Sequence, residues 1–75
     1  MVYRYYCLDL PPSEPGAVPK GMVGYEETTE DTYFPEIECT AWGFVDYTRR
    51  LTAEEVDQYM LRGPVVQPEI RASKR

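Results

Sequence analysis

Four prolines fall within nine residues early in the chain and separate a short leading segment from a longer body. They are Pro11, Pro12, Pro15 and Pro19. Each proline holds its own φ near about −65° and disfavours helix in the residue before it. Residues 11–21 are therefore predicted to form a stiff, extended loop. Such a loop is either a rigid connector across the end of a sheet or a pre-ordered binding loop.

The segments on both sides of this loop have the two-residue period of β-strands. Val2 to Leu10 is rich in tyrosine and valine, which favour strands, and both of its faces are largely apolar. The sequence therefore does not show which face of this strand is buried. A second strand is expected over Met22–Thr28, followed by a polar turn at 29–31 and a further extended run that ends at Pro35.

Apolar and polar residues alternate again from Ile37 onward. One face is expected to carry Ile37, Cys39, Ala41, Val45 and Tyr47, and the other Glu38, Thr40, Trp42, Phe44 and Asp46. Gly43 lies within this strand, where glycine weakens pairing unless a bulge or a close approach of two backbones requires it. One aromatic pair is therefore either exposed or covered by another part of the chain.

A helix is predicted over about Ala53 to Arg62. Thr52 and Glu55 form the Thr-x-x-Glu capping box, in which each residue satisfies a backbone N–H near the start of the helix. Leu51 and Val56 have the spacing of a hydrophobic staple. Val56, Tyr59 and Met60 share the face expected to pack on the sheet. Gly63 and Pro64 are expected to end the helix, and two valines after them can add a short pairing segment.

These elements predict one small α+β domain over residues 1–67. Its expected architecture is an antiparallel sheet of three or four strands, with one C-terminal helix packed on one face. Residues 68–75 are expected to form a disordered basic tail, because their polar and charged side chains have little to bury. A chain of 75 residues has a small core, so a homodimer or a tightly fitting partner would add stability.

The middle of the chain is strongly acidic. Residues 21–48 contain seven carboxylates and no basic residue, together with six aromatic side chains. The net charge is −5, and because the last twelve residues carry +2, the remaining 63 carry −7. Such a body repels nucleic acid and anionic membranes and is attracted to basic protein surfaces. The candidate partner-binding residues are Glu26, Glu27, Glu30, Asp31, Glu36, Glu38, Trp42 and Phe44. The simpler interpretation is that these carboxylates only keep a small protein soluble.

Several chemistries are disfavoured by composition. The chain has no histidine, which removes the commonest general base and the usual nucleophile–histidine pairs. The two cysteines, Cys7 and Cys39, could supply at most two of the four ligands of a zinc site. The sequence also lacks a phosphate-binding loop and the ligand spacing of an EF-hand. We therefore expect no catalytic residues, no metal and no cofactor. The first residues lack a signal region and no apolar run reaches membrane-spanning length, so a cytoplasmic protein with reduced thiols is expected, although the two cysteines could pair.

The chain resembles a group of short uncharacterised proteins of phages and mobile elements from Gram-positive gut bacteria. The likeness covers about sixty residues and rests on Tyr3-Arg4-Tyr5-Tyr6, the prolines of the loop with Gly16 and Lys20, the run Ala41–Tyr47, and Leu51-Thr52 with Glu55. The resemblance brings no established activity with it. It implies mobile-element biology, in which small acidic proteins often antagonise host defence, as anti-CRISPR proteins do.

Together these features favour a non-enzymatic binding protein that occupies a basic surface of a host protein, such as a nucleic-acid-binding nuclease of a defence system. One alternative is a nucleotide-capturing protein, in which tyrosines stack on bases and Arg4, Arg49 and Arg50 meet phosphates. A small structural or oligomer-forming module is a further alternative.

Overall fold

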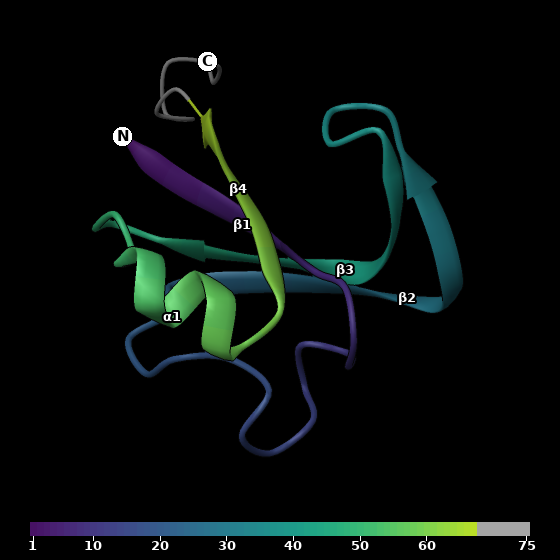
Figure 1. The fold of residues 1–75 in the computed structure, drawn as a ribbon, viewed down its shortest axis with the longest axis horizontal. Helices are drawn as coiled ribbons and strands as arrows, with labels where there is room; N and C mark the ends of the chain where they lie inside the picture. Colours follow the sequence, from purple (N-terminus) through teal and green to yellow (C-terminus); the bar gives the residue numbers. More distant parts are fainter. Residues whose placement is uncertain (68–75) are drawn as a thin grey trace, which may run out of the picture.

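In a computed structural model, which describes residues 1–67, the chain forms a four-stranded antiparallel sheet with one short helix (Figure 1). The elements are β1 (Val2–Cys7), β2 (Gly24–Phe34), β3 (Cys39–Tyr47), α1 (Ala53–Gln58) and β4 (Leu61–Gln67). The strands lie in the order β2-β3-β1-β4. The predicted α+β class and the antiparallel sheet are thus confirmed, whereas the predicted tail lies outside the described residues.

β1 is a central strand, and both of its faces are buried. Tyr5 and Cys7 belong to one hydrophobic cluster, and Tyr6, between them, belongs to a second cluster. Tyr5 and Tyr6 are both fully shielded from solvent. The sequence did not show which face of β1 is buried, because both rows of its side chains are apolar. The structure buries both rows.

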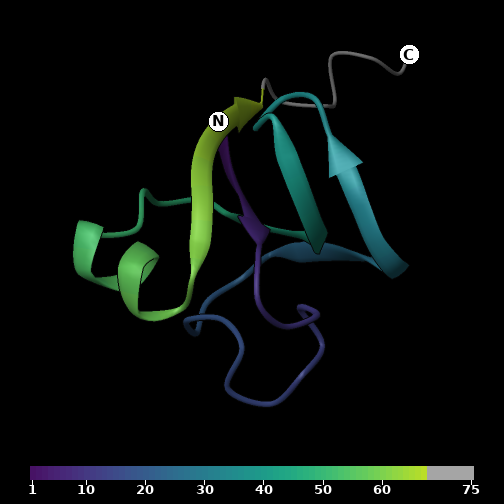
Figure 2. The same ribbon diagram turned by 45° about the vertical axis from the view of Figure 1, so that its right-hand side comes forward.

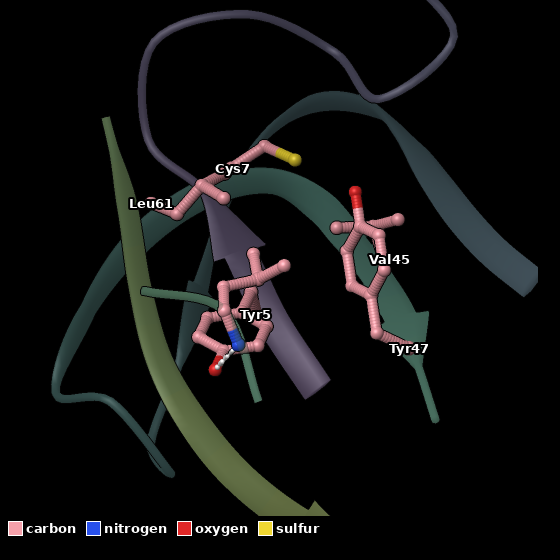
Figure 3. Close-up of a cluster of buried hydrophobic side chains, with 6 residues drawn as sticks. Tyr5, Cys7, Val45, Tyr47 and Leu61 are labelled. Carbon is pink, nitrogen blue, oxygen red and sulfur yellow. Dashed lines mark hydrogen bonds between the residues drawn. The ribbon is translucent and has the colours of Figure 1, made fainter. Parts of the chain in front are cut away.

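The first cluster lies on the face covered by α1 and by the proline-rich loop. Its buried members are Tyr5, Cys7, Val45, Tyr47, Leu51 and Leu61 (Figure 3). Val56 and Tyr59 of the helical segment pack against them, which confirms that the helix packs on one face. The hydroxyl of Tyr47 donates a hydrogen bond to the carbonyl of Pro19. The loop therefore covers one end of the core. It is not extended as predicted, because it folds into two turns: the N–H of Glu14 donates to the carbonyl of Pro11, and the N–H of Ala17 donates to the carbonyl of Glu14, both at 3.0 Å.

The second cluster lies on the opposite face, under the bent end of the β2–β3 hairpin. Its buried members are Tyr6, Ile37 and Ala41, with Val65 of β4 packed against them. Figures 1 and 2 show the end of β2 and the start of β3, next to the hairpin turn, bending sharply away from the rest of each strand. The bend occurs where the β2–β3 register shifts, between Glu27 and Thr32. Bending in this way gives a small sheet a second core without a second layer of helices.

Gly43 makes this bend sterically feasible. Its φ of 141° lies in a region that L side chains rarely adopt, and a Cβ there would lie 2.2 Å from the carbonyl oxygen of Glu26. Of the two reasons considered for a glycine within this strand, a bulge or a close approach of two backbones, the structure shows the close approach. The prediction of one continuous apolar row along β3 is wrong in part, because Ala41 packs in the second cluster and Val45 in the first.

The predicted turn at 29–31 is wrong. β2 is one strand that ends at Phe34, as the following proline predicted, and the hairpin turn occupies residues 35–38. The polar residues that suggested a turn lie instead within the register shift. There the carbonyl of Glu30 accepts hydrogen bonds from the hydroxyls of Thr28 and Thr32. These side chains satisfy the backbone locally, so the strand continues despite the irregularity.

The helix begins where predicted but ends four residues early. The capping box is present: Oγ1 of Thr52 accepts from the N–H of Glu55 at 3.1 Å, and Oε1 of Glu55 accepts from the N–H of Thr52 at 2.9 Å. Met60, expected on the buried helical face, has a φ of 56° and is 52% exposed.

The residues after Met60 form β4, so Gly63 and Pro64 lie within a strand and the helix is not the last element. Leu61 is buried and pairs with Cys7. Burial of Leu61 and pairing with the side of β1 opposite β3 outweigh local helix propensity, which is a weak preference in so short a segment.

Candidate protein-binding site

Four of the predicted binding carboxylates lie on β2, an edge strand of the sheet. Glu26, Glu27, Glu30 and Asp31 are all exposed. Within residues 1–67, β2 pairs only with β3, so its outer edge faces solvent. Charged side chains on an edge strand discourage unwanted pairing with other strands. Their exposure also leaves them available to a basic partner.

The outward carboxylates of β2 differ in their local contacts. Oδ2 of Asp31 accepts a hydrogen bond from the hydroxyl of Thr40 at 3.0 Å, and Oε1 of Glu27 accepts from the backbone N–H of Ser13 at 3.1 Å. The second contact ties the proline-rich loop to β2. Glu27 thus contributes to the position of the loop as well as to the acidic surface.

Glu36 and Glu38 both lie in the hairpin turn and not on a strand. Oε2 of Glu36 accepts a hydrogen bond from the hydroxyl of Tyr6 at 2.7 Å, and this bond lowers the pKa of the Glu36 carboxyl. Burial, together with Glu36, raises the pKa of Tyr6 to about 12. Glu38 adopts a positive φ of 59° at the end of the turn. Glu36 therefore anchors the turn to the central strand.

Trp42 and Phe44 are both half-buried, so neither is a fully exposed aromatic anchor. The guanidinium of Arg4 lies 3.8 Å from the centre of the Phe44 ring. That guanidinium also donates two hydrogen bonds to Asp46, at 2.8 and 3.0 Å. This stacked ion pair could not be predicted from the alternation of side chains, because Arg4 and Asp46 lie 42 residues apart.

The structure brings three of the predicted residues together around one small cleft. A hollow of about 210 Å³ is lined by Glu26, Glu27, Thr28, Phe34, Gly43 and Phe44. Glu26 and Phe44 are directly opposed on β2 and β3, so their side chains lie on the same face. Phe34, which was not predicted as a binding residue, adds a second aromatic ring. The cleft exists because β2 shifts register opposite Gly43.

Comparison with known families assigns the chain to one of them. Residues 1–64 match the family described as Defence against restriction A C-terminal. The chain belongs to this family. No curated protein and no solved structure matches the chain significantly.

Membership of the Defence against restriction A C-terminal family agrees with the expected anti-defence biology. The resemblance to phage and mobile-element proteins is supported at that coarser level, while the particular host group remains a prediction. Among the described residues, no helix is long and apolar enough to cross a membrane.

The two cysteines of this family member differ in burial. Cys7 is buried and Cys39 is half-buried, and both thiols are free. Burial raises the pKa of Cys7 to about 12, which opposes formation of a nucleophilic thiolate. Among residues 1–67, no group of three or more histidine, cysteine, aspartate or glutamate side chains could hold a metal ion.

A larger hollow lies between α1 and β4. It measures about 590 Å³, and its lining includes Leu8, Val56, Met60, Leu61 and Pro64. Apolar side chains dominate this lining, and its charged groups are Arg50 and Asp57. Such a surface resembles a shallow contact area more than a reaction centre, because it presents no nucleophile beside a base.

Proposed function

We propose that this chain is a non-enzymatic binding protein of a phage or mobile element that counters restriction by occupying a basic surface of a host protein. The observation that carries the proposal is the match of residues 1–64 to the Defence against restriction A C-terminal family. Restriction systems contain proteins that bind DNA, and DNA-binding surfaces are basic. An acidic protein is complementary to such a surface.

The distribution of charge supports this mode of action. Four exposed carboxylates follow one another along the edge strand β2, on a chain with a net charge of −5. Charges around an interface mainly accelerate and orient association, whereas well-packed side chains at its centre determine how slowly the complex dissociates. In this proposal the carboxylates of β2 attract the basic surface, and the half-buried aromatic residues beside them provide the packed contact.

The contacts of the arginines disfavour nucleotide capture. Arg4 makes two hydrogen bonds to Asp46, and Arg49 makes two to Glu55 at 3.0 Å. Two of the three arginines considered for phosphate contacts are therefore neutralised by carboxylates of the same chain. A nucleotide would have to displace those carboxylates, at the cost of charge-assisted hydrogen bonds.

The test measures protection against restriction in living cells. The chain is expressed in a bacterial strain that carries an active restriction system, and the plating efficiency of an unmodified phage is compared with that of an empty-vector strain. We expect the wild-type chain to raise the plating efficiency. We expect protection to be lost when Glu26, Glu30 and Asp31 are replaced by lysine.

A matched control reverses three exposed carboxylates elsewhere, with Glu14, Glu54 and Asp57 replaced by lysine. Both triple variants change the net charge equally, so a difference between them reports on the position of the charge. Proteins captured by the wild-type chain are identified by mass spectrometry, and their association rates are measured at low and physiological salt. Equal protection by the two triple variants, or no protection by the wild type, would contradict the proposal.

A further inference from the structure

Two arginines of this chain share one mode of recognition. The guanidinium of Arg4 lies over the ring of Phe44 and is hydrogen-bonded by both oxygens of Asp46. The guanidinium of Arg49 lies 5.8 Å from the centre of the Tyr47 ring and is hydrogen-bonded by both oxygens of Glu55. In each case an aromatic face and a carboxylate together hold one guanidinium, which is a favourable combination for arginine.

The cleft beside β2 offers the same combination of groups. Phe34 and Phe44 supply aromatic surface, and Glu26 supplies a carboxylate on the same face as Phe44. Phe44 contacts Arg4 and Tyr6, and Phe34 contacts Tyr6, but neither Arg4 nor Tyr6 lines the cleft, where part of each phenylalanine ring forms the wall. The residues that line the cleft are acidic, aromatic, small or hydroxyl-bearing, and none of them is basic.

The volume of the cleft limits which ligands can fill it. Small-molecule sites usually measure about 300–1,000 Å³. The volume of about 210 Å³ lies below that range. A cleft of this volume suits a single long side chain. A nucleotide would exceed the cleft, whereas one side chain projecting from a protein surface would fit.

We propose that this cleft receives one arginine side chain from the basic surface of the partner. The inference rests on the proposed function and specifies its contact. The guanidinium would lie against the parts of Phe34 and Phe44 that line the cleft and donate hydrogen bonds to the carboxylate of Glu26. Arginine fits better than lysine because its planar guanidinium stacks on rings and bonds a carboxylate at two points.

The test uses a blocked Gly-Arg-Gly tripeptide as the probe and the ¹⁵N-labelled full chain as the receptor. Titration is followed by amide chemical shifts, with Gly-Lys-Gly and Gly-norleucine-Gly tripeptides as comparisons. We expect saturable shifts at the amides of Glu26, Thr28 and Gly43 with the arginine peptide. The lysine peptide should bind several-fold more weakly, and the norleucine peptide should give no saturable shift at these amides.

Glu26→Gln tests the role of the carboxylate while preserving the shape of the side chain. Because Glu26 is exposed, this variant should fold, and its amide spectrum will show whether it does. We expect it to weaken binding of the arginine peptide about three- to tenfold, as loss of a charge-assisted hydrogen bond at an accessible site predicts. Glu54→Gln, at an exposed position in the first turn of α1, is the matched control and should bind like the wild type.

The outcomes separate this inference from the proposed function. Absence of saturable shifts at the three amides, or equal affinity of Glu26→Gln and the wild type, would overturn the arginine cleft. Protection against restriction that persists in the Glu26→Gln variant at the wild-type level would also overturn it, while leaving the proposed function standing. Saturable binding of the arginine peptide by a chain that gives no protection would support the cleft and refute the function.

Discussion

The phenolic oxygen of Tyr5 accepts a hydrogen bond from the backbone N–H of Leu51, 2.9 Å away in the interior of the protein (Figure 3). Tyr5 is fully buried and Leu51 is 4% exposed. Tyr5 comes from the central strand, and Leu51 lies directly before the N-cap of α1. This bond therefore fixes the start of the helical segment relative to the sheet.

Replacing Tyr5 by phenylalanine should cost about 1–3 kcal/mol of unfolding free energy, because the buried N–H of Leu51 would lose its acceptor. Urea unfolding followed by circular dichroism measures the change. Tyr25→Phe is the control, since Tyr25 is 49% exposed, and it should change stability by less than about 0.5 kcal/mol. A Tyr5→Phe variant as stable as this control would show that water or another group replaces the acceptor.

Gly43→Ala should destabilise the protein by about 2 kcal/mol or more. The new Cβ would lie 2.2 Å from the carbonyl oxygen of Glu26 and 2.9 Å from the Cα of Glu27, at a φ of 141°. Gly24→Ala in the same hairpin is a matched control, because a Cβ there meets nothing within 4 Å. Thermal unfolding of both variants provides the comparison. Similar midpoints would mean that β2 and β3 can separate at the bend without loss.

Stability should fall as the pH rises above about 9. Burial raises the pKa of Cys7 from 9.0 to about 12 and those of Tyr6 and Tyr47 from 10.0 to about 12. Between these values the unfolded chain has released protons that the folded chain still holds, so the folded state loses stability with increasing pH. The contribution of these groups to the stability of the folded state is complete below pH 9 and is lost as the pH rises to about 12.

Thermal midpoints measured between pH 7 and 12 test this dependence. Cys7→Ala should flatten the first part of the decline, between about pH 9 and 10, because it removes the group whose unfolded pKa is lowest. Phenolate absorbance should show Tyr6 and Tyr47 ionising late. A midpoint that stays constant up to pH 11 would contradict the assigned shifts.

The candidate site was predictable only in part. The acidic stretch and its aromatic residues could be read from composition, and Glu26, Glu27 and Phe44 do line one cleft. Phe34 and the contact between Arg4 and Phe44 could not be read in this way. Both depend on how β2 and β3 bend and on which strand lies next to β1, and these are long-range contacts that no local pattern encodes.

The sequence by itself determined the features that depend on near neighbours. The prolines kept residues 11–21 free of helix and strand, Thr52 and Glu55 specified the start of the helix, and Pro35 specified the end of β2. Each of these effects acts through dihedral angles or hydrogen bonds within a few residues. Tertiary structure alone decided the strand order, the conversion of the expected end of the helix into β4, and the burial of both faces of β1. These outcomes follow from packing and strand pairing between distant residues, such as Leu61 against Cys7 and Glu26 against Gly43, whose free energies exceed weak local preferences.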